Sequence, residues 1–265
     1  MIENPKSGSV KKLTALLRKK DRLLNKKFVA EGPQAVIEAL KHSPDSIISL
    51  YTTVTGRSNF PELDKLADAA DVPIQMVSDG VFQAFTDTVK PQGVAALLRF
   101  APADLASVFQ GAKLVAVLSE VRDPGNAGAV LRAADAAGAD AVVFAGDSID
   151  PWHPKVVRST TGSLFHLPVC YGVSLADTVT AAKAAGLVTV AADIRGETLS
   201  PQAAVLRDPH AWVFGNEARG LTAADRELCD SVLRLPIYGS AESLNLATAA
   251  AVCLYSSAFA QRQPS

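Results

Sequence analysis

The chain of 265 residues has little of what secreted and membrane proteins need. Its three cysteines, Cys170, Cys229 and Cys253, lie far apart, which argues against a disulfide framework and against a cysteine metal site. No apolar run is long enough to span a membrane, and the N-terminus lacks the apolar core of a signal peptide. We therefore expect a protein of the cytoplasm that does not bind a membrane.

Several motifs that identify common enzyme classes are also missing. The sequence has no GxGxxG dinucleotide loop, no Walker lysine loop and no GxSxG nucleophile elbow. The four histidines, His42, His153, His166 and His210, form no cluster in the sequence, so we interpret them as structural and expect no metal. Because the formal net charge is only -1, the overall charge predicts no partner either.

The charge is nevertheless unevenly distributed along the chain. Between residues 11 and 27 stand eight basic residues and a single acid, Asp21. Residues 11–24 carry leucines at helical spacing, which predicts a helix with an apolar face and a basic face. Such a block can bind RNA phosphates, although a merely solvated helix face is the alternative. The basic residues are Lys11, Lys12, Arg18, Lys19, Lys20, Arg22, Lys26 and Lys27.

The pattern of apolar residues predicts two domains of α/β structure. Residues 1–100 form a small domain, with the basic helix, a second helix after Gly32-Pro33, and strands at 47–51, 73–77 and 94–100. Residues 101–112 have no strong pattern and are predicted to be a linker. In residues 113–265, five strands alternate with alanine-rich helices, which predicts a parallel sheet covered by helices. The strands are 114–118, 141–144, 187–191, 212–214 and 232–235; the helices are 127–137, 175–185 and 243–261.

Three loops in the second domain are rich in glycine and polar residues. The first, DPGNAG, follows strand 114–118 and contains Asn126, with Arg132 six residues later. The second, GNEARG, begins at Gly215, directly after strand 212–214, and contains Glu217. The third begins at Leu235 and leads to the last helix. Because ligands bind at the carboxyl ends of parallel strands, these loops predict an enzyme site.

Each of these residues also has an ordinary structural explanation. Asn126 could cap a helix, Glu217 could be solvated, and Ser243 and Asn245 could be capping residues and nothing more. Arg132, on an alanine-rich helix, could be a surface residue. Spacing alone therefore leads only to an α/β enzyme whose site is built from three loops.

Taken together, the three loops resemble the three motifs of the SpoU (TrmH-like) family of RNA ribose 2′-O-methyltransferases, in the SPOUT superfamily. Motif one is matched by Asn126 and Arg132, and motif two by residues 213–220 with Glu217. Motif three is matched by residues 235–237 and 243–247. The segment from Asp150 to Phe165, and the N-terminal segments FVAEG (28–32) and PQG (91–93), are also similar to the family.

This resemblance implies a fold, a cofactor and a set of site residues. The first domain would be an L30e-like RNA-binding domain, and the second would bind S-adenosylmethionine (AdoMet) in a deep trefoil knot, an exception to the rule against threading. The active form would be a homodimer whose sites are completed near the subunit interface. The implied residues are Asn126, Arg132, Glu217, Ser243 and Asn245 for catalysis, Gly215, Leu235, Ile237 and Leu244 for AdoMet, and Lys11, Lys12, Arg18, Lys19, Lys20, Arg22 and Arg158 for RNA.

The chemistry suggests a role for the arginine. A ribose 2′-hydroxyl is a poor nucleophile, so transfer needs in-line positioning and help with the hydroxyl proton. Accounts of the family often make this arginine the base, which is the alternative to a charged clamp. A guanidinium keeps its proton in proteins, so we expect Arg132 to stabilise the developing alkoxide and a neighbouring phosphate. The proton would leave late, or through water or Glu217. Gly215 would allow the backbone to approach the cofactor closely.

Ribosomal RNA is the expected substrate, because an N-terminal extension of this type accompanies many relatives that act on it. Transfer RNA is an alternative. So is a non-catalytic RNA-binding factor for ribosome assembly that retains the fold, and so is another nucleotide enzyme that uses residues 125–128 as a phosphate loop. The last of these leaves the second and third loops unexplained.

Overall fold

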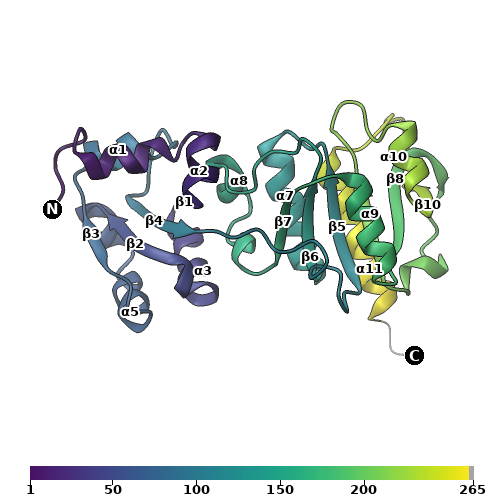
Figure 1. The fold of residues 1–265 in the computed structure, drawn as a ribbon, viewed down its shortest axis with the longest axis horizontal. Helices are drawn as coiled ribbons and strands as arrows, with labels where there is room; N and C mark the ends of the chain where they lie inside the picture. The colour runs from purple at the N-terminus through teal and green to yellow at the C-terminus, as the bar shows by residue number, and fades with distance from the viewer. Residues whose placement is uncertain (263–265) are drawn as a thin grey trace. The chain divides into compact units, whose positions relative to one another are not determined.

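The structure, a computed structural model, describes residues 1–262 of the chain, and its contacts divide the chain into two compact units. The N-terminal unit comprises Met1–Ala101 together with Trp152–His166. The C-terminal unit comprises Pro102–Pro151 and the chain from Leu167 onward. Figure 1 shows the elements of both units along the chain. In the described part of the chain, no helix is both long and apolar enough to cross a membrane.

The N-terminal unit is built on a mixed sheet in the order β1-β4-β2-β3. Strand β4 runs antiparallel to both of its neighbours, whereas β2 and β3 are parallel. Its main core joins residues of α1 and α6 with β1 and β4, and is centred on Phe82 and Phe85. Its elements are α1 (Gly8–Ala15), α2 (Lys19–Asn25), β1 (Lys27–Glu31), α3 (Pro33–His42), η1 (Pro44–Ser46), β2 (Ile47–Thr52), α4 (Val54–Asn59), α5 (Glu62–Ala69), β3 (Ile74–Met76), α6 (Asp79–Phe85), β4 (Val94–Arg99), α8 (Pro154–Ser159) and η2 (Ser163–Phe165).

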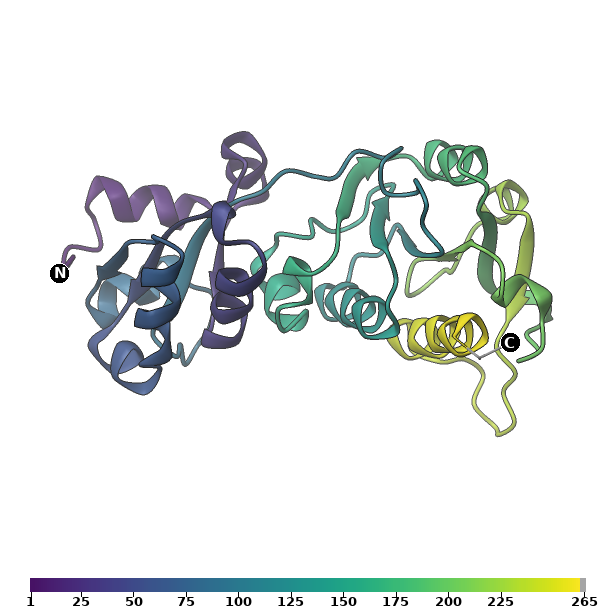
Figure 2. The same ribbon diagram turned by 90° about the horizontal axis from the view of Figure 1, so that it is seen from below.

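The C-terminal unit has six parallel strands in the order β10-β8-β9-β5-β6-β7. Helix α9 packs into the core on one face of this sheet, and α7 and α11 lie side by side against it (Figure 2). Parallel strands buried on both faces read as continuous apolar runs, as β5 and β6 do. The elements are β5 (Leu114–Ser119), α7 (Pro124–Ala137), β6 (Ala141–Ala145), β7 (Val169–Val173), α9 (Leu175–Ala184), β8 (Val188–Thr198), η3 (Ala204–Leu206), β9 (His210–Phe214), α10 (Ala223–Leu228), β10 (Ser231–Arg234) and α11 (Leu246–Gln261).

Helix α11 is fixed to the sheet by a buried polar network. The hydroxyl of Ser257 accepts a hydrogen bond from Trp212 Nε1 at 2.8 Å and lies 2.7 Å from His210 Nε2. Burial lowers the pKa of His210, and its Nδ1 lies 2.7 Å from the carbonyl oxygen of Asp208. Because a carbonyl can only accept, Nδ1 carries the proton of the neutral ring and Nε2 accepts from Ser257. The network therefore holds the last helix in one position on β9.

The predicted α/β class is confirmed, and each strand that the sequence predicts is present, but four local predictions are wrong. One is the last helix, which begins at Leu246 and not at 243; the others are the end of β8, the single N-terminal helix and the linker. The strands β1 and β7 were not predicted, and β8 extends to Thr198, beyond the predicted end at 191. The single helix predicted over 11–24 is two helices, and Leu24 on α2 is 76 % exposed. Residues 102–112, expected to form a linker, belong to the C-terminal unit, where Phe109 is fully buried.

The break between α1 and α2 is stabilised by Arg22, which is only 1 % exposed. Its Nη1 donates to the carbonyl oxygens of Leu16 and Leu17, both at 2.8 Å, just after α1 ends. A cation at this position also complements the negative end of the helix dipole. Arg22 is therefore a structural residue, and its assignment to the RNA-binding block is wrong because its guanidinium is buried.

This arrangement predicts a difference between two arginines of the same block. Arg22→Ala should lower the free energy of unfolding by about 2–3 kcal/mol, because a buried and a part-buried carbonyl group lose a charged donor. Arg18→Ala should change it little, because Arg18 lies on the surface in an exposed ion pair with Asp21. Urea unfolding followed by circular dichroism measures both variants. Equal stability of the two would contradict the structural role of Arg22.

Candidate active site

The three glycine-rich loops meet at the carboxyl edge of the parallel sheet, after β5, β9 and β10. The first loop leads into the start of α7. Asp123 is its N-cap, since Asp123 Oδ1 accepts a hydrogen bond from the backbone N–H of Asn126 at 2.7 Å. Asn126 therefore lies in the first turn and is not the capping residue. Its side chain is left available for another partner.

That partner is Asn245, at the start of α11. Asn245 Nδ2 donates to Asn126 Oδ1 at 3.0 Å, which joins the first loop to the third. Asn245 Oδ1 also caps α11 by accepting from the N–H groups of Ala247 and Thr248. Nδ2 of Asn126 has no hydrogen-bond partner among residues 1–262, so this donor is available to a ligand.

Glu217 joins the second loop to the first. Its Oε1 accepts from the backbone N–H of Asp123 at 2.9 Å and from that of Arg122 at 3.2 Å. Its Oε2 lies 3.3 Å from the same Arg122 nitrogen and accepts from Asn216 Nδ2 at 3.4 Å. Both carboxylate oxygens are thus engaged in holding the turn before α7. This geometry suits a residue that positions the loop better than one that takes a proton from substrate.

Two predicted catalytic residues have no such partners. Arg132 and Ser243 are exposed, and neither side chain makes a hydrogen bond or ion pair with the rest of the described chain. Six residues of helix between Asn126 and Arg132 correspond to about 1.7 turns and about 9 Å of rise, so their side chains leave α7 in different directions. The structure of one chain therefore joins Asn126, Glu217 and Asn245 but does not bring Arg132 to them.

The residues predicted to bind AdoMet line the second and third loops. Leu235 is half-buried, and Ile237 and Leu244 are exposed. Residues 236–244 make no backbone hydrogen bond with the rest of the described chain, so their N–H and C=O groups are available to a ligand. Exposed aliphatic side chains beside unpaired backbone groups are the chemistry that an adenine ring and its polar edge require. The donor set fits AdoMet in this respect.

The structure shows a packing role for Gly215, while its contact with AdoMet stays a prediction. A Cβ built there would lie 2.5 Å from the carbonyl carbon of Gly220 and 2.6 Å from the nitrogen of Leu221. The close approach that requires glycine is therefore an approach to the chain itself, where the second loop folds back on its own start. A larger residue would displace this loop, which makes Gly215 a packing position in the first instance.

The predicted RNA-binding residues differ in their surroundings. Lys11, Lys12, Lys19 and Lys20 are exposed on α1 and α2. Arg158, on α8, instead lies 3.1 Å from Asp87 and 3.5 Å from Glu31, so two carboxylates of the N-terminal unit already compensate its charge. Lys11, Lys12 and Lys20 are available to phosphates, whereas Arg158 would have to give up acidic partners.

A charged network beside the three loops was not predicted. Glu120 follows β5 directly, has a φ of +59°, and accepts from Arg219 Nη2 at 2.9 Å. Arg122 pairs with Asp147 at 2.9 Å, and Asn216 Nδ2 donates to the carbonyl of Glu120 at 2.8 Å. A left-handed backbone is rare for a residue other than glycine and is found at functional sites. The position of Glu120 at a strand's carboxyl end was the available signal in the sequence.

Comparison with known proteins agrees with this architecture. Residues 113–255 match the SpoU rRNA Methylase family, and residues 7–96 match the MRM3-like substrate binding domain. These matches cover the two regions that the sequence separates into a smaller and a larger α/β domain.

The similar proteins match this chain over most of their own length. The 23S rRNA (guanosine(2553)-2′-O)-methyltransferase RlmP of Bacillus subtilis is 36 % identical over 96 % of this chain and 97 % of its own length. The 23S rRNA (guanosine-2′-O-)-methyltransferase RlmB of Bordetella pertussis is 34 % identical over 86 % of this chain and 96 % of its own length. A crystal structure of an AdoMet-bound rRNA methyltransferase from Sinorhizobium meliloti superposes with a TM-score of 0.84 at 28 % identity, covering 97 % of this chain and 96 % of the other.

The two halves of the chain thus match in order along its length, and the loops carrying the family's motifs meet at one edge of the sheet. This confirms the predicted family and its AdoMet-dependent RNA methyl transfer. The chain belongs to the SpoU rRNA methylase family.

Proposed function

We propose that this enzyme transfers a methyl group from AdoMet to a ribose 2′-hydroxyl of 23S ribosomal RNA, in the cytoplasm. The observation that carries the proposal is the hydrogen bond between Asn126 and Asn245, which joins the first and third motif loops, with Glu217 joining the second. The relatives named above are 23S rRNA 2′-O-methyltransferases, which supports this substrate over transfer RNA. Bound AdoMet supplies a methyl group that its sulfonium already activates.

The residues of the chain then have to position and activate the hydroxyl. Asn126 Nδ2, whose oxygen is already bonded to Asn245, donates to the ribose or to the phosphate beside it. Glu217 keeps the turn before α7 in place and does not take the proton, because both of its oxygens are engaged. The proton leaves late, to water. Ser243, exposed at the end of the third loop, orients the nucleotide.

Arg132 stabilises the charge that develops on the 2′-oxygen. Its guanidinium has no competing carboxylate in the described part of the chain, so it can bind the developing alkoxide and a substrate phosphate together. Because Arg132 leaves α7 away from Asn126, it completes the site of a second chain in a homodimer. The chain of this domain forms a deep trefoil knot, which binds AdoMet.

The role of Arg132 predicts a loss of rate that exceeds the loss of binding. Arg132→Ala should bind AdoMet nearly normally and RNA somewhat less tightly, yet transfer methyl on the order of a hundredfold more slowly. Arg132→Lys should recover only part of the rate, because lysine keeps the charge and loses the planar fork. The measurement is single-turnover transfer of labelled methyl to ribosomal RNA at saturating cofactor and RNA. Wild-type turnover by Arg132→Ala would make Arg132 a binding residue only, and wild-type turnover by Arg132→Lys would show that the planar fork is not required.

The basic surface of α1 and α2 holds RNA phosphates. Replacing Lys11, Lys12, Lys19 and Lys20 with alanine should weaken RNA binding and lower the slope of log affinity against log salt by roughly 0.7 to 0.9 per lost contact. AdoMet affinity should stay the same, which is the control for folding. Filter binding at several salt concentrations measures the slope. An unchanged slope would mean that these four lysines are only solvated and do not bind RNA phosphates.

The homodimer is supported by an apolar stripe on α11. Val252, Tyr255 and Phe259 stand at the i, i+3 and i+7 positions of this helix, and all three are exposed. Three large apolar residues on one face of a helix mark an interaction surface. Helix α7, which carries Arg132, packs directly against α11, and Tyr255 Oη donates to the carbonyl of Ala136. The stripe and Arg132 thus belong to neighbouring helices.

A charge within the stripe should separate the subunits. Phe259 is 65 % exposed, so Phe259→Asp should leave the fold intact, yield monomers in sedimentation velocity, and reduce methyl transfer at least as much as Arg132→Ala. Val54→Asp is the matched control, since Val54 is 64 % exposed on α4 and should leave the dimer unchanged. A Phe259→Asp dimer, or an active monomer, would refute the shared site.

A further inference from the structure

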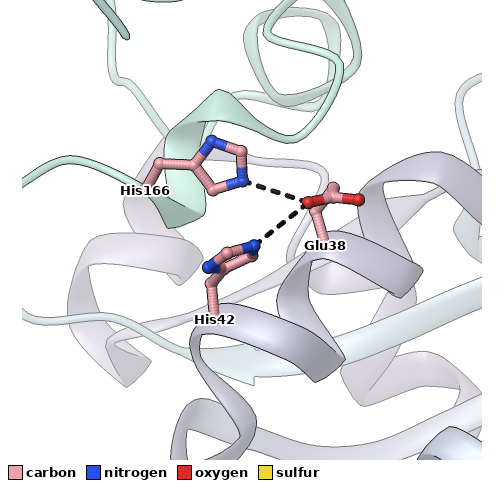
Figure 3. Close-up of side chains that lie close together, drawn as sticks. All are labelled: Glu38, His42 and His166. Carbon is pink, nitrogen blue, oxygen red and sulfur yellow. Dashed lines mark hydrogen bonds and ion pairs between the residues drawn. The ribbon is translucent and has the colours of Figure 1, made fainter. Parts of the chain in front are cut away.

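Three potential metal ligands converge in the N-terminal unit, far from the motif loops in the sequence. Glu38 and His42 lie one turn apart on α3, and His166 follows η2 (Figure 3). Both imidazole Nε2 atoms point at the same carboxylate oxygen, Glu38 Oε2, at 3.3 Å from His42 and 3.1 Å from His166. In the described part of the chain, no other group of three such side chains comes this close together. The histidines that form no cluster in the sequence therefore form one in the structure.

The distances are close to those of ligands around a single ion. The three donor atoms all lie within 4.8 Å of one another. Ligand atoms 2.0–2.2 Å from a tetrahedral ion are separated by roughly 3.4 Å, and two of the three separations here already have about that value. A small rotation of the two rings, which meet edge to face with centroids 4.4 Å apart, brings in the third.

The surroundings hold the carboxylate and its neighbours in this arrangement. Lys41 Nζ binds Glu38 Oε1 at 3.2 Å, which leaves Oε2 for the two rings. Gly162 has a φ of +107°, and a Cβ there would lie 2.5 Å from Cγ of Glu38, so only glycine allows the turn before η2 to approach α3. His42 is 48 % exposed and His166 26 %, so an ion can enter from solvent.

We propose that Glu38, His42 and His166 form a site for a divalent ion of the zinc class, with water completing its coordination. Two imidazoles and one carboxylate suit Zn²⁺, Co²⁺ and Ni²⁺, whereas Mg²⁺ and Ca²⁺ prefer oxygen ligands alone. The bound ion cross-links α3 to the turn that carries His166, two segments 128 residues apart at Glu38 and His166. Its effect is on stability, and methyl transfer does not depend on it.

Among residues 1–262, the three cysteines and His210 are poor competitors for zinc. Burial raises the pKa of Cys253 to about 12 and that of Cys229 to about 11, and it also raises the pKa of Cys170. Thiols that stay protonated and buried are poor ligands. His210 is buried in its bonds to Ser257 and Asp208. A titration of the whole protein should therefore report on the proposed site.

The test uses the full-length protein without a histidine tag, titrated with ZnCl₂ by calorimetry and with CoCl₂ by visible absorption. Wild type should bind one ion per chain and melt at a higher temperature with zinc present. Glu38→Gln and His42→Gln keep the size of each side chain and should weaken binding by on the order of tenfold or more, since loss even of an outer hydrogen-bond partner has effects of that size. Glu62→Gln, an exposed carboxylate on α5, is the matched control.

A variant with the opposite expected sign makes the test independent of folding defects. Lys41→Ala removes a positive charge from Glu38 and should tighten binding, because the ammonium and the metal ion compete for the same carboxylate. Lys90→Ala, which removes an exposed lysine elsewhere in the unit, should leave the affinity unchanged. The proposal is overturned if wild type shows no saturable binding, if Glu38→Gln and His42→Gln bind as wild type does, or if Lys41→Ala weakens binding.

Discussion

The position of α11 on the sheet is the constraint on which the rest of the site depends. Ser257 is held by His210 and Trp212 on β9, in a pocket where an unpaired hydroxyl or imidazole would be costly. That attachment, a little over three turns from the start of the helix, sets where Asn245 stands at its first turn. Because Asn245 both caps α11 and binds Asn126, a shift of the helix would separate the first motif loop from the third. The buried network and the surface site are therefore one mechanical unit.

The sequence predicted those parts of the structure that depend on neighbouring residues, and it missed those that depend on residues far apart in the chain. Strands β5 and β6 are continuous apolar runs and α9 has clear boundaries, so these elements were predicted from local pattern alone. Strand β7 was missed, and α11 begins at Leu246, after the predicted start at 243. The break between α1 and α2 was missed because it is stabilised by a buried guanidinium, and a basic residue in an amphipathic pattern reads as exposed. The linker was misassigned because the burial of Phe109 depends on the sheet that it packs against.

For the site, too, the sequence identified the residues but not their contacts. The members of the three motifs could be named from their spacing and family resemblance, but their contacts could not. Nothing in the sequence says that Asp123, rather than Asn126, caps α7, or that Gly215 is required by the backbone of Gly220. The meeting of His42 with His166 is the extreme case, because α3 and the turn after η2 come together only once the chain has folded. Spacing identifies candidates, and only the fold shows which of them touch.

The polar groups of the site are of two kinds: some have hydrogen-bond partners within the chain, and others do not. Glu217 and Asn245 use most of their hydrogen-bonding capacity within the chain, so each fixes geometry, and neither can change partners during a reaction without loosening a loop. Asn126 Nδ2 and the Arg132 guanidinium have no partner in the described chain, and in the proposed mechanism they bind the charge that appears only as the methyl group moves. Arg132 stands on α7, which packs against the helix that carries the apolar stripe, and its side chain leaves α7 in a different direction from that of Asn126. In the proposed homodimer, a second chain therefore brings these two groups to one ribose, so that the contact that buries the exposed apolar surface also completes the chemistry.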